Sequence, residues 1–74
     1  MSRLIRMDSS GHATLAEWTA KDDAAFAAAV EEFRGQLCQG YIGTVPEGPG
    51  KATHVRDLPR GADLVVMRRP IAGG

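Results

Sequence analysis

Residues 19–40, TAKDDAAFAAAVEEFRGQLCQG, decide the fold because they contain the most regular periodic pattern in the chain. The apolar residues at the spacing of one helical face are Phe26, Ala29, Val30, Phe33 and Leu37. This spacing predicts a helix that ends near Gln39, with Gly40 placed to stop it in a left-handed conformation. Residues 19–22 have the form of a capping box, in which Thr19 is the N-cap and the Asp22 carboxylate reaches back. We expect this helix to pack its apolar face on a sheet.

Short apolar and β-branched stretches on both sides of the helix predict the strands of that sheet. Before it, residues 3–7 and 12–18 form a candidate hairpin around the turn Asp8-Ser9-Ser10-Gly11, where Gly11 suits a positive φ. After it, the expected strands are residues 41–45, 52–56 and 64–67, with a loop at 46–50 and a turn at 58–61. The order β-β-α-β-(β)-β predicts an α+β roll, with one helix packed across a mixed sheet. If the first and last strands pair in the middle of this sheet, the chain leaves the sheet from its centre.

The composition is that of one small domain without a strong charge bias. Of the 74 residues, 43% are apolar, and nine basic side chains balance nine acidic ones. The chain therefore has no general attraction to nucleic acid or to an anionic membrane, although residues 1–40 carry a net −2 and residues 41–74 a net +2. No stretch approaches the roughly 20 apolar residues that span a bilayer, and charges interrupt the first residues too soon for a signal peptide. We expect a cytoplasmic protein.

The last seven residues, Arg68-Arg69-Pro70-Ile71-Ala72-Gly73-Gly74, are the most informative for function. Two terminal glycines offer no side-chain chemistry, which leaves an α-carboxylate on a thin stem. Because glycine lacks a Cβ, another protein can hold such a backbone in a narrow channel. An ordinary frayed chain end is the alternative interpretation. We predict a folded domain at residues 1–69 and a flexible tail at residues 70–74.

The stretch from Leu58 to Gly74 contains a turn glycine at Gly61, an acidic residue at Asp63, an apolar strand and the Gly-Gly end. In this order of features the chain resembles the ubiquitin-like β-grasp superfamily, and more narrowly its small bacterial and archaeal sulfur carriers and modifiers. The opening hairpin and helix, with Trp18, also look like small actinobacterial and phage-encoded proteins that end in Gly-Gly.

The resemblance implies a function in which the chain is not itself an enzyme. A partner adenylating enzyme of the E1-like class would use ATP to activate the carboxylate of Gly74, and sulfur or an amine would then be attached. The receiving partner would be an acceptor protein or a sulfur-accepting enzyme. Gly73 would supply the thin stem, while Pro70, Ile71 and Ala72 would set the exit of the tail. The resemblance implies no catalytic residue, metal or cofactor within the chain.

Arg68 and Arg69 depart from the sulfur carriers, which often have paired prolines and aromatic residues before the tail. They are closer to the basic tail of ubiquitin, and an arginine can pair bidentately with an acidic docking surface. Sulfur carrier and protein modifier therefore both stay open. A competing hypothesis is a β-grasp binding or structural module, with a phage origin as one option, in which the edge strands and these two arginines matter more than the carboxylate. A stand-alone enzyme ranks last because no convergent acid, base and nucleophile are visible.

The remaining candidate sites have simpler structural explanations. We interpret the single cysteine, Cys38, as a small semi-buried hydrophobe; alone it excludes an internal disulfide. His12 and His54 are too far apart in sequence to predict a metal site. Asp8, Ser9 and His12 share one tight turn, which favours local hydrogen bonds over a catalytic triad. The glycines of residues 47–51 lack the spacing of a phosphate-binding loop.

Overall fold

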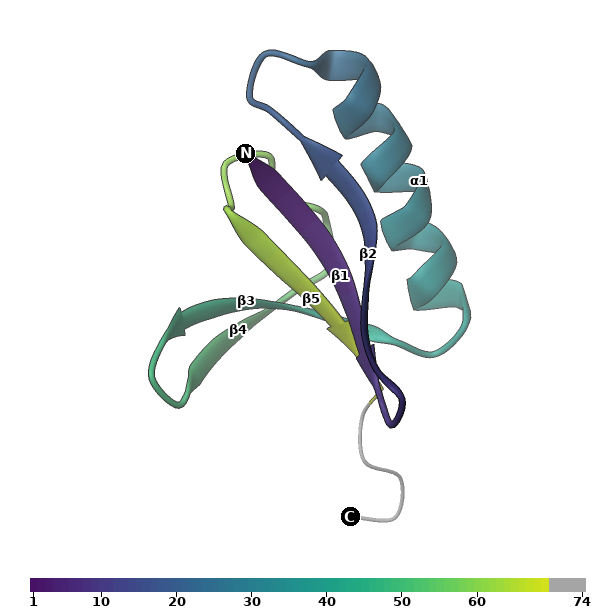
Figure 1. Ribbon diagram of the computed structural model, residues 1–74, viewed down its shortest axis with the longest axis vertical. Coiled ribbons are helices and arrows are strands. Elements are labelled where there is room, and N and C mark those ends of the chain that lie inside the picture. The colour runs from purple at the N-terminus through teal and green to yellow at the C-terminus, as the bar shows by residue number, and fades with distance from the viewer. Residues whose placement is uncertain (70–74) are drawn as a thin grey trace.

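Five strands and one helix make up residues 1–69, the part of the chain that this computed structural model describes (Figure 1). The elements are β1 (Ser2–Asp8), β2 (Gly11–Trp18), α1 (Asp23–Cys38), β3 (Ile42–Gly48), β4 (Lys51–Val55) and β5 (Leu64–Arg68). The order of elements agrees with the predicted α+β architecture. No helix among residues 1–69 is long and apolar enough to cross a membrane.

The strands form a single mixed sheet in the order β2-β1-β5-β3-β4. The first and last strands, β1 and β5, lie side by side and parallel, with Leu4 opposite Val65, and the other pairs are antiparallel. Parallel neighbours need a long crossover connection, and residues 9–63 supply it here. The central pairing of the first and last strands, which the sequence allowed but did not require, is present in the sheet. β5 is the middle strand, so the chain reaches Arg68 and Arg69 at the centre of one sheet end.

The helix covers one face of this sheet and packs mainly along β2 (Figure 1). Its predicted apolar face is confirmed: Ala29 and Phe33 are buried, and Phe26, Val30 and Leu37 pack partly buried against the core. The buried apolar residues of the core are Leu4, Trp18, Ala29, Phe33, Tyr41, Leu58, Val65 and Met67. On β5 the alternation of the pleat is clear, because Val65 and Met67 both point into the core.

The start of α1 differs from the predicted capping box. Asp22, and not Thr19, is the N-cap, and its Oδ1 accepts a hydrogen bond from the Ala25 backbone N–H at 2.9 Å. The Thr19 carbonyl instead accepts from the Asp22 N–H at 3.1 Å, in a turn that follows β2. Aspartate is an N-cap at least as good as threonine, so the helix begins after this turn. At the other end the prediction is confirmed, because α1 ends at Cys38 and Gly40 has φ +95°.

The predicted loop at residues 46–50 is wrong, because β3 continues through Pro46 to Gly48. Only Thr44 and the two residues before it pair with β5, so the rest of β3 pairs with β4 alone. A strand that is paired on one side only tolerates a proline, which lacks the N–H of a ladder hydrogen bond. The register shifts between Pro46 and Gly48, and the turn is confined to Pro49 and Gly50. The β3–β4 hairpin projects away from the helix (Figure 1).

Candidate functional site

A hollow of about 640 Å³ lies at the end of β5, where the chain leaves the sheet. We call it the tail-base hollow, and its lining residues are Met7, Asp8, Ser9, Ser10, Tyr41, Arg68 and Arg69. They come from the end of β1 and the turn that follows it, from the residue before β3, and from the end of β5 with the residue after it. The sheet order places these three segments together, because β1 and β3 both flank β5.

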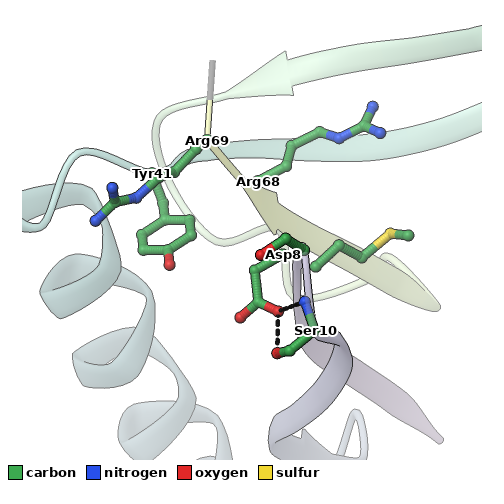
Figure 2. Close-up of a pocket in the computed structure, with 7 residues that line it drawn as sticks. Asp8, Ser10, Tyr41, Arg68 and Arg69 are labelled. Atoms are coloured by element: carbon green, nitrogen blue, oxygen red, sulfur yellow. Dashed lines mark hydrogen bonds between the residues drawn. The ribbon is translucent and has the colours of Figure 1, made fainter. Parts of the chain in front are cut away.

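Tyr41 is the aromatic platform of this hollow. The guanidinium carbon of Arg69 lies 5.1 Å from the centre of the Tyr41 ring, and that of Arg6 lies 5.8 Å from it. Both distances are within the range of a cation–π interaction. Figure 2 shows Arg69 reaching across the ring, whereas Arg68 points in the other direction, as alternation along a strand requires. The two arginines therefore present their charges on opposite sides of the departing chain.

The β1–β2 turn supplies the only carboxylate among the lining residues. Asp8 Oδ1 accepts hydrogen bonds from the Ser10 backbone N–H at 2.9 Å and from the Ser10 hydroxyl at 2.5 Å (Figure 2). The hydroxyl bond above all, and then the backbone bond, hold the pKa of Asp8 below its ordinary value. Burial opposes this shift, and the nearby Arg6 charge adds a smaller lowering effect. This carboxylate is therefore engaged in the turn, and the predicted turn with local hydrogen bonds is confirmed.

Arg6 adds a third positive charge beside the tail base. Its Nε lies 3.6 Å from Asp8 Oδ2, an ion pair too long for a hydrogen bond, and this buried nitrogen has no hydrogen-bond partner. With Arg6, Arg68 and Arg69 against the single Asp8, the surroundings of the hollow carry an excess of positive charge. A partner with clustered carboxylates matches this arrangement electrostatically.

A second hollow, of about 380 Å³, lies on the face of the sheet that α1 does not cover. We call it the open-face hollow, and its lining residues are Met7, Thr44, Pro46, Gly50, Lys51, Ala52, Val66 and Arg68. Thr44 and Val66 form its buried floor, where the Thr44 hydroxyl donates to the Val66 carbonyl at 3.1 Å. Its lining includes two cations and no carboxylate. Met7 and Arg68 line both hollows, so the two are continuous.

The predicted site residues divide into two groups. Arg68 and Arg69 are exposed at the tail base, whereas Pro70, Ile71, Ala72, Gly73 and Gly74 lie outside the described residues. Tyr41 was predicted only as a strand residue. Its role depends on arginines far from it in sequence, and no local pattern could have indicated their meeting.

The other candidates are separated in the fold. His12 lies on β2 and His54 on β4, which are the two opposite edges of the sheet. Within residues 1–69 no three His, Cys, Asp or Glu side chains are grouped so that they could hold a metal ion. Cys38 is exposed, so its interpretation as a semi-buried residue is wrong. It follows Leu37 by one residue, and this step turns its side chain about 100° away from the apolar face.

Comparisons with models of protein families, with curated proteins and with solved structures find no match. The functional assignment therefore depends on the residues of the chain and on their placement. The strongest local feature is the basic, aromatic tail base, which lies where β5 ends.

Proposed function

We propose that the chain is a ubiquitin-like β-grasp protein that acts through the carboxylate of Gly74, either as a protein modifier or as a sulfur carrier. One observation carries the proposal: the central strand β5 leads directly into Arg68, Arg69 and the Gly-Gly segment. Gly74 is the reacting residue in two cases: if the chain is synthesised with Gly74 as its last residue, and if a protease cuts a longer chain after Gly74. The proposal places the protein in the cytoplasm, where ATP is available.

The sheet supports the β-grasp part of this proposal. Its order β2-β1-β5-β3-β4, its parallel central pair and its single helix on one face are the arrangement expected of such a roll. A tail that continues a central strand is held at its base by neighbours on both sides. Met7 and Ile42 pair with Arg68, which fixes the direction in which the chain departs.

The tail base supports the docking part of the proposal. An adenylating partner must bind the folded domain so that the Gly74 carboxylate enters its active site. Arg68 and Arg69 diverge, so they can contact two sides of the partner's entrance, and Arg69 is restrained by its contact with Tyr41. A guanidinium pairs bidentately with carboxylates, so acidic residues at this entrance would orient the tail.

The chemistry requires the partner because a free carboxylate is a poor electrophile. A carboxylate oxygen of Gly74 attacks the α-phosphorus of ATP, pyrophosphate leaves, and an acyl adenylate is formed. A sulfur nucleophile or an amine then attacks the carbonyl carbon, and AMP leaves with the electrons of the C–O bond. The chain contributes position and the carboxylate, while the partner supplies the catalytic groups.

Intact mass spectrometry of the untagged protein from its native cells tests the proposal. Replacement of one oxygen by sulfur at Gly74 identifies a carrier, and covalent adducts through Gly74 identify a modifier. The variant Gly74→Leu should abolish either product while the circular dichroism stays unchanged. Gly61→Leu is the matched control, because Gly61 is exposed in a turn with no heavy atom within 4 Å of an added Cβ. A chain that stays unmodified in active cells overturns the proposal.

The open-face hollow favours one alternative, a binding module that is never conjugated. Its cationic rim and its buried floor of Thr44 and Val66 form a docking surface that needs no tail chemistry. A photo-crosslinking side chain at Lys51 in native cells distinguishes the two functions. A discrete cross-linked partner that persists in Gly74→Leu supports the module, and a partner that is lost in this variant supports conjugation.

A further inference from the structure

A third hollow, of about 180 Å³, lies on the helix side of the sheet, between α1 and the connection from β4 to β5. We call it the helix-flank hollow, and its lining residues are Phe26, Val30, Phe33, Arg34, Arg56, Asp57 and Leu58. It shares no residue with the tail-base hollow or the open-face hollow. The helix packs along β2 and much less on β3. On this flank, residues 56–58 of the connection from β4 to β5 line the hollow opposite α1.

The apolar walls of this hollow are held in place by contacts with neighbouring side chains. The Phe26 ring packs edge-on against Trp18 at 5.7 Å between ring centres, and the guanidinium of Arg60 lies 4.4 Å from the Phe26 ring centre. Phe33 and Leu58 are buried. A preformed apolar site binds without the entropic cost of first ordering its own walls.

The size of the hollow selects the kind of occupant. Sites for small-molecule ligands and cofactors usually measure about 300–1,000 Å³, and this hollow is smaller. It accommodates one apolar side chain, as do the pockets that receive anchor residues at protein interfaces.

The rim adds charge selectivity. Arg34 and Arg56 are exposed, and among residues 1–69 neither guanidinium takes part in an ion pair or side-chain hydrogen bond. Arg3, Arg6 and Arg60, by contrast, each pair with a carboxylate. Asp57 is the only acidic lining residue, so the rim is positive overall. Carboxylates on either side of the inserted side chain would complement it.

We propose that the helix-flank hollow binds a short segment of a partner protein, in which one leucine-sized side chain is flanked by carboxylates. The side chain fills the space between Val30 and Leu58, and the carboxylates pair with Arg34 and Arg56. Residues 1–69 of a second copy do not supply this segment, because their exposed large apolar side chains are Met1 and Met7. Met7 stands beside Arg68, so it would bring further positive charge to a positive rim. The proposal is independent of the chemistry at Gly74.

Nuclear magnetic resonance titration of the ¹⁵N-labelled full chain tests the proposal with the peptide acetyl-Gly-Glu-Leu-Glu-Gly-amide. Saturable shift changes should concentrate on residues 26–34 and 56–58. Replacing the peptide leucine by serine, or both glutamates by glutamine, should weaken binding, and added salt should weaken it further. Two exposed ion pairs predict that the double variant Arg34→Gln, Arg56→Gln binds about 2- to 30-fold more weakly.

Arg3→Gln is the matched control, because it removes an exposed arginine of the sheet that does not line this hollow. It should bind the peptide as the wild type does. The proposal is overturned if the leucine and serine peptides cause equal shifts, if the shifts map to the open-face hollow, or if no saturable change occurs at residues 26–34. Preserved amide spectra of the variants show that they remain folded.

Discussion

Gly43→Ala is the sharpest test of the packing that holds α1 on the sheet. A Cβ built on Gly43 would lie 2.6 Å from Phe33 Cε1 and 2.9 Å from Phe33 Cζ, and 3.2 Å from the Val55 carbonyl oxygen. The Phe33 ring is only 1% exposed, so it cannot move aside into solvent. The Val55 carbonyl belongs to the neighbouring strand β4, so the pairing of the two strands prevents this oxygen from moving away from the added methyl group. The methyl group must therefore displace the ring, either against packed side chains or toward the helix-flank hollow that Phe33 also lines.

The expected cost follows from this overpacking. Extra methyl groups in a well-packed core destabilise proteins by about 1–3 kcal/mol. In a domain of this size each 1 kcal/mol shifts the melting temperature by roughly 4–8 °C. We therefore expect Gly43→Ala to lower the melting temperature by at least about 4 °C. Urea unfolding followed by the fluorescence of Trp18, the single tryptophan and 2% exposed, should give the same free-energy change.

Gly35→Ala is the control, because it makes the same substitution where the structure has room. Gly35 lies inside α1, and an added Cβ would meet no heavy atom within 4 Å. Removing a glycine from a helix should stabilise the fold by about 0.5–1 kcal/mol. The two substitutions should thus change stability in opposite directions, which separates the contact with Phe33 from any general effect of replacing glycine.

A double-mutant cycle with Phe33→Leu identifies the contact itself. Phe33→Leu alone should destabilise the core by leaving a cavity. In the double variant the alanine methyl group occupies part of that space, so the two costs should fall short of additivity by about 0.5–3 kcal/mol. Strict additivity, or a Gly43→Ala variant as stable as the wild type, would refute the close approach of β3 to α1.

Substitutions at three further residues test the fold and its acid sensitivity. Asp22→Ala should cost about 0.5–2 kcal/mol by removing the N-cap of α1, and Asp22→Asn should restore most of it in urea unfolding. Trp18→Phe should cost at least about 1 kcal/mol in thermal unfolding followed by circular dichroism, because the indole N–H loses its 3.0 Å hydrogen bond to the Arg60 carbonyl. The Ser10 hydrogen bonds lower the pKa of Asp8 from its ordinary value of 3.8, so the stabilisation is present above that value and is lost as pH falls through the folded-state pKa. The stability difference between wild type and Asp8→Asn, measured by urea unfolding across pH 2–6, should therefore shrink below about pH 4; a difference that does not change with pH would contradict this origin.

The helix and the central strand pair could be predicted because their determinants are local or topological. The face of α1 containing Ala29 and Phe33 follows from a 3.6-residue period, which depends only on side chains within the helix. The pairing of β1 with β5 follows from the handedness of a crossover, which allows few arrangements.

The length of β3 and the start of α1 could not be predicted, because they depend on neighbours in the fold. A proline interrupts a strand that has hydrogen-bonded neighbours on both sides, whereas a strand paired on one side tolerates it. The sequence does not show that β3 is no longer paired with β5 after Thr44, so it does not show that Pro46 can lie inside β3. Thr19 and Asp22 are both acceptable N-caps, and the choice depends on the turn that follows β2. The exposure of Cys38, by contrast, could have been predicted, because this position lies outside the apolar face of the helix.

The tail base was only half predictable for a related reason. Arg68 and Arg69 are visible as a basic pair, but Tyr41 acquires its role from the sheet order, which brings β1 and β3 to the two sides of β5. A cation–π contact between residues 41 and 69 has no signature in either segment. The basic character of the site could therefore be predicted, and its aromatic platform could not.

The separation of the hollows has a consequence for how partners can act together. The tail-base hollow and the open-face hollow share Met7 and Arg68. A partner that docks in the open-face hollow therefore either contacts the tail base as well or competes with a second partner that binds there. The helix-flank hollow shares no lining residue with either and lies behind the sheet. A segment bound there should leave Arg68 and Arg69 free, so both sites can be filled at once. If the glutamate–leucine peptide changed the amide signals of Arg68 and Arg69 as strongly as those of residues 26–34, the two sites would be coupled and this independence would be wrong.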